Sequence, residues 1–150
     1  MADSPIVQIH KKIVELIAID YAAGYSTVNL IGNVIRGLFS EPSIVPSACV
    51  HFQDIAEEYG PTFGRFSGNA IFEIFCFIGG ANPQERSDQS LNLASDIITA
   101  LTANRQLGLG SLVDDIKCDY SSVDGDKFGF NGIGIGYIRA TIKFQSDTGV

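Results

Sequence analysis

Residues that support metal and thiol chemistry are scarce in this sequence. Tryptophan is absent from the 150 residues, and there are one methionine, two histidines and three cysteines. Cys49, Cys76 and Cys118 are scattered, no two have the spacing of metal ligands, and their odd number does not suit a disulfide framework. We therefore expect buried free thiols in a protein made in a reducing compartment, and no zinc site.

Basic residues are also few, since ten Lys and Arg stand against seventeen Asp and Glu, for a formal net charge of −7. This balance argues against a general nucleic-acid binder and against binding to an anionic membrane. The most apolar stretch, 70–78, is too short to span a bilayer, and the N-terminus shows no signal-like segment. We expect a protein made in the cytoplasm, with no membrane partner.

Apolar residues are plentiful, at 45% against 18% charged, which predicts one folded domain over residues 1–150. Ser4 and Pro5 form a helix start, and isoleucines then recur at helical spacing until near Asp20. The segment 82–85, Asn-Pro-Gln-Glu, is the start signature of a second helix that should end before Gly108.

Between the helices the hydrophobic period changes to that of strands. Alternation predicts strands at 48–53, 69–78, 113–120 and 133–144, with a polar, mobile connector at 54–68. Residues 33–38 predict a short strand or extended segment. The expected fold is therefore α+β in the order α-ββ-α-ββ, with two helices packed on one face of a mainly antiparallel four-stranded sheet.

No group of residues has the pattern of a catalytic, cofactor-binding or metal site. Cys49 and His51 point the same way on a strand, but nothing nearby supplies an oxyanion hole. Neighbouring carboxylates on a strand, such as Glu57 and Glu58, point to opposite faces and cannot share a proton. The run Gly-Ile-Gly-Ile-Gly at 132–136 leads into a strand, whereas a nucleotide-binding loop opens a helix.

The 70–78 strand is apolar on both faces, although two helices can cover only one face of a sheet. Either loops of the same chain or a neighbouring subunit must cover the other face. The alternate glycines near residue 135 leave room for another strand to approach. The candidate assembly interface comprises the second-face apolar residues, the connector's charged and aromatic residues, and two of these glycines: Ile71, Phe75, Phe77, Glu57, Glu58, Tyr59, Gly134 and Gly136.

A pattern over about residues 5–145 resembles a known family. It comprises the first helix, Val34-Ile-Arg36 with a proline before the next strand, Phe72-Glu-Ile-Phe75, Leu91-x-x-Ala94-x-x-Ile97, and Ile138-Arg-Ala-Thr-Ile142-Lys-Phe144. This order resembles the tail terminator and tail completion proteins of tailed phages. Such proteins share architecture far more than sequence, so no individual residue role is carried over.

The resemblance implies a non-enzymatic virion protein, assembled in the host cytoplasm, without a cofactor. It implies a homo-oligomeric, hexameric ring on the head-proximal end of the tail tube, which stops tube polymerisation. The implied partners are the tail tube protein, the head connector or stopper protein, and the tail sheath if the tail is contractile. DNA would only pass through the lumen.

Two alternatives remain open from the sequence. The protein could be another neck or tail component, such as a head-completion, stopper or tube protein. It could also be a small α+β enzyme or ligand-binding domain, for which Cys49, His51 and Tyr59 are the few polar candidates.

Overall fold

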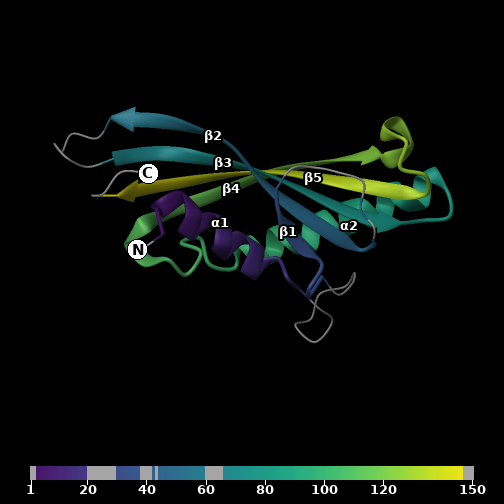
Figure 1. Cartoon of the computed structure of the whole chain (residues 1–150), viewed down its shortest axis with the longest axis horizontal. Helices are drawn as coiled ribbons and strands as arrows, with labels where there is room; N and C mark the ends of the chain where they lie inside the picture. The colour runs from purple at the N-terminus through teal and green to yellow at the C-terminus, as the bar shows by residue number, and fades with distance from the viewer. Residues whose placement is uncertain (1–2, 20–29, 38–41, 43, 60–65, 147–150) are drawn as a thin grey trace.

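The computed structural model describes residues 3–19, 30–37, 42, 44–59 and 66–146, and only the backbone of 57–59 (Figure 1). The described elements follow one another as α1 (Pro5–Leu16), β1 (Val34–Arg36), β2 (Ser47–Tyr59), β3 (Phe66–Gly79), α2 (Pro83–Thr102), η2 (Gly110–Leu112), β4 (Val113–Asp124), η3 (Gly125–Phe128) and β5 (Ile133–Ser146). The α+β class is as predicted, and the four long strands run along the length of the molecule (Figure 1).

Both helices begin where the sequence places their caps. The Ser4 hydroxyl accepts a hydrogen bond from Val7 N, and the Asn82 side chain accepts one from Glu85 N at 2.9 Å. The Glu85 carboxylate accepts a second hydrogen bond from Ala81 N at 3.0 Å, the residue before the Asn82 cap, which fixes the chain as it enters the helix. α1 ends at Leu16, before the predicted end near Asp20.

The sheet has five strands in the order β1-β2-β3-β5-β4, so the predicted four-stranded sheet is wrong in number. β1 lies parallel to β2, and the other neighbours are antiparallel, which makes the sheet mixed. The extra strand is the segment predicted as short or extended. Gly32 and Gly37, both with positive φ angles, lie on either side of it, and a chain in that conformation does not continue a strand.

The first hairpin is longer than predicted. Most of the 54–68 connector is strand, because β2 continues to Tyr59 and β3 begins at Phe66. A register shift between Phe52 and Asp54 lets the paired backbone continue through the polar sequence. The remaining connector residues, 60–65, lie outside the described part of the chain. The predicted mobility of the connector therefore stays a prediction.

Both helices pack on the same face of the sheet, as predicted. Alternate residues of β3, among them Phe72, Ile74 and Cys76, form one buried cluster with residues of α1 and α2. His10 of α1 is buried in this layer, and its Nε2 donates to the Val50 carbonyl at 2.9 Å. Burial lowers the pKa of His10, because a charged imidazole would lose its hydration there.

Candidate assembly surface

The sheet face turned away from α1 and α2 is called the open face here. Since side chains alternate along a strand, β3 directs Ile71, Glu73, Phe75 and Phe77 onto it. The structure thus brings together the three apolar residues that the sequence predicted for a second face. Ile71 and Phe75 are half-buried, whereas Phe77 is 2% exposed.

One end of the open face is apolar and partly closed by the chain itself. Cys49, Phe77 and Ile135 form a second buried cluster, and Phe75, Phe130 and Ile133 pack against it. Phe130 belongs to the turn between β4 and β5, so a turn of the same chain packs against the cluster that contains Phe77. Of the predicted apolar trio, Ile71 and Phe75 therefore keep the more accessible surface.

The middle of the open face is polar. The strand register aligns His51, Glu73, Arg139 and Asp119 in one row across β2, β3, β5 and β4. The Tyr137 hydroxyl donates to Glu73 Oε2 at 2.9 Å. Burial, followed by this bond to a carboxylate, raises the pKa of Tyr137. Charges of both signs alternate along the row, which suits water or a polar partner.

The three residues that the sequence predicted for the interface from the connector lie at the end of β2, in the first hairpin. Glu57, Glu58 and Tyr59 are the last residues of β2, and their backbones pair with Gly68, Ser67 and Phe66. The structure describes this backbone register and not the side chains of the three residues.

Gly134 and Gly136 lie on the helix side of the sheet and not on the open face. A Cβ on Gly136 would meet Cys76 Sγ at 2.5 Å and the Ser90 carbonyl oxygen at 2.8 Å, and one on Gly134 would collide with the Arg86 backbone. The space beside these glycines is therefore occupied by α2 of the same chain. Their predicted role in admitting a neighbour's strand is corrected to that of admitting this helix.

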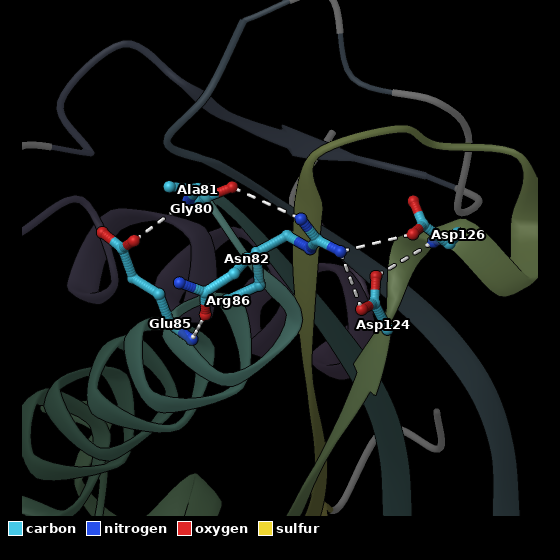
Figure 2. A network of polar contacts seen from close by, with 7 residues as sticks. All are labelled: Gly80, Ala81, Asn82, Glu85, Arg86, Asp124 and Asp126. Atoms are coloured by element: carbon cyan, nitrogen blue, oxygen red, sulfur yellow. Dashed lines mark hydrogen bonds and ion pairs between the residues drawn. The ribbon is translucent and has the colours of Figure 1, made fainter.

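A buried arginine holds the turn that closes the apolar end (Figure 2). The Arg86 side chain is 8% exposed, and its Nη2 lies 3.1 Å from Asp124 Oδ2 and 3.2 Å from Asp126 Oδ2. Its Nη1 donates to the Gly80 carbonyl at 3.4 Å. The guanidinium of Arg86 lowers the pKa of Asp124, helped by the Asp126 backbone N–H. The Arg86 side chain thus links Gly80, which follows β3, to the turn between β4 and β5.

Three glycines allow close packing around Arg86 and the turn that it holds. A Cβ on Gly80 would lie 2.7 Å from Arg86 Cγ, and one on Gly125 would lie 2.5 Å from the Ile133 carbonyl oxygen. Gly134 is the third, as described above. Sequence reasoning missed Arg86 and its ion pairs. The available signal was an arginine on the apolar stripe of α2, together with two Asp in a glycine-containing turn.

The thiols are not prepared for nucleophilic chemistry. Burial raises the pKa of Cys49 and Cys118 to about 11 and that of Cys76 to about 12, so each is protonated at neutral pH. Cys49 therefore offers His51 no thiolate to pair with. Within the described residues, no three His, Cys, Asp or Glu side chains gather as metal ligands, and no helix is long and apolar enough to cross a membrane.

Comparisons with known proteins give a similarity to solved structures and none in sequence. No family model and no curated protein matches this sequence. A chain from a solved structure described as "Virion of native gene transfer agent (GTA) particle" aligns with 77% of this chain and 81% of its own length, with a TM-score of 0.44 and 8% sequence identity.

Proposed function

We propose that this protein is a structural subunit of a phage tail, which assembles into a ring at the head-proximal end of the tail tube. The observation that supports an assembly role is the one-sided sheet. Both described helices lie on one face, and the open face retains the half-buried Ile71 and Phe75 beside a polar row. A sheet face of this kind is suited to contact another protein.

The choice of a tail terminator comes from the order of sequence features and is consistent with the α+β fold. In this role the ring ends tube growth and presents a surface to the head connector or stopper protein. The ring is hexameric in the proposal, and DNA passes through its lumen. An acidic chain suits that passage, because carboxylates do not hold phosphates.

Native mass spectrometry and negative-stain electron microscopy of the purified full chain test the proposal. A closed ring with the mass of six chains is the expected result. Open-ended tubes would instead identify a tube protein, the second candidate. A monomer at every accessible concentration would contradict self-assembly of the free protein. Phe75→Ser, with the exposed helix substitution Asn92→Asp as a control, tests whether the open face takes part.

A further inference from the structure

The open face divides along the strands into an apolar end and a charged end. The apolar end is built around the buried cluster that contains Phe77. It continues into exposed surface, because Ile35 aligns with Cys49 and is 57% exposed. The ring of Phe128, which is 53% exposed, lies 6.2 Å from that of Phe130, which packs against the same cluster. An apolar surface that stays exposed beside a buried cluster is suited to contact another protein.

In the charged end, equivalent places on the two sides of the midline between β3 and β5 carry opposite charges. In the polar row, Glu73 of β3 lies beside Arg139 of β5. In the next row, Asp54 of β2 and Lys117 of β4 lie at the two ends, both exposed, with one residue of β3 and one of β5 between them. A face with this pattern is complementary to a copy of itself in which the two sides are exchanged.

We infer that two copies of this chain pack open face to open face, related by a two-fold axis that runs along the strands between β3 and β5. This rotation places β3 opposite β5 of the second copy, and β2 opposite its β4. Glu73 then faces Arg139 of the second copy and Asp54 faces its Lys117, and the symmetry repeats each contact. A two-fold axis across the strands would instead place Glu73 against Glu73, so the charges select one arrangement.

The same rotation brings the two apolar ends together. Phe75 and Tyr137 are neighbours across β3 and β5, so Phe75 faces Tyr137 of the second copy, and both side chains are half-buried in the single chain. In the polar row, His51 comes to face Asp119, which joins an imidazole donor to a carboxylate acceptor. Twisted sheets pack face to face in β-sandwiches with their strands within about 30° of each other.

The contact is small, so the pair is separable. The face is four strands wide, at about 4.8 Å each, and extends from Asn69 to Phe77 of β3, at about 3.4 Å per residue, so its footprint is roughly 600 Å² per copy. Stable complexes bury about 800 Å² per partner. We therefore expect single chains and pairs in equilibrium. The inference goes beyond the proposed function, because it gives the free chain a paired form that separates before the open face contacts another protein.

Two charge variants and their mixture test the inference. Asp54 and Lys117 of one chain are three strand spacings apart, about 14 Å, which exceeds the screening length of about 8 Å at physiological salt, so the two charges scarcely interact within the chain. Asp54→Lys and Lys117→Asp should each weaken self-association by about tenfold, because like charges then meet twice in the pair. An equimolar mixture should form mixed pairs of about wild-type affinity, since both contacts again join opposite charges.

Sedimentation over a concentration series gives the affinities, and circular dichroism checks that each variant is folded. Asn92→Asp, on the exposed side of α2, is the control for an added charge and should pair as wild type. Single variants that pair as tightly as wild type, or a mixture that pairs no more tightly than its folded components, would overturn the inference. Wild-type chains that pass from monomer to ring without a pair would also overturn it and leave the proposed ring in place, whereas pairs without rings would support it and count against the proposed function.

Discussion

Replacing Gly136 by alanine is the sharpest test of how β5 and α2 pack. The added Cβ would lie 2.5 Å from Cys76 Sγ, 2.8 Å from the Ser90 carbonyl oxygen and 3.3 Å from Ala94 Cβ. The Cys76 and Ser90 distances lie below 3.0 Å, which real Cβ contacts essentially never show, so the helix must move. Overpacking of this kind costs about 3 kcal/mol. Alanine's advantage over glycine in a strand offsets about 0.5–1 kcal/mol, so a net loss of about 2 kcal/mol is expected.

Urea unfolding followed by circular dichroism, at one protein concentration, measures this loss. Gly79→Ala is the matched control, since its Cβ would have no atom nearer than 3.8 Å and should leave stability within about 1 kcal/mol of wild type. Adding Cys76→Ala to Gly136→Ala removes one of the two closest atoms, so the double variant should lose less than the sum of the single losses. Wild-type stability of Gly136→Ala with impaired assembly would refute the packing argument and place this glycine at a subunit contact.

Three further predictions concern the buried histidine, the open face and the thiols. The pKa of His10 is lowered in the folded chain, so the unfolded chain binds more protons and the free energy of unfolding should fall as the pH drops through about 6.5. Equilibrium unfolding at pH 5 to 8 should show a smaller pH-dependent change for His10→Gln than for wild type. An equal change in both proteins would contradict the role given to His10. Phe75→Asp should reduce assembly, measured by sedimentation, more than folding, measured by circular dichroism, and an intact ring would remove the open face from the interface. The double variant Cys49→Ala/His51→Gln should assemble as wild type once any stability change is allowed for, whereas complete loss of function in a stable ring would point to chemistry at this pair.

Local signals explain why the helix starts and the long strands were predictable. A cap such as Asn82 acts on a backbone donor three residues away, so its evidence lies within one turn of sequence. The alternation in β3 and β5 likewise reflects burial on one face of a sheet. Polar residues after Phe52 hid the continuation of β2, because paired backbone does not require apolar side chains.

The features that sequence reasoning missed depend on contacts between distant segments. The short strand or extended segment predicted at 33–38 is β1, but its place in the sheet was missed, because its pairing with β2 joins residues 14 positions apart. The role of Gly136 depends on where α2 lies, which spacing along β5 does not reveal. Arg86 acquires its partners 38 and 40 residues later, so the ion pairs become visible only when the second hairpin is folded against α2.

The edge strand β4 has two features that discourage pairing with other chains. An uncovered edge strand invites pairing with any exposed strand, and charged side chains together with a bulge discourage it. β4 has both, with its carboxylates at Asp114, Asp115 and Asp119 and a register shift between Val113 and Asp115. The exposed Tyr120 therefore lies on an edge strand that resists general strand addition.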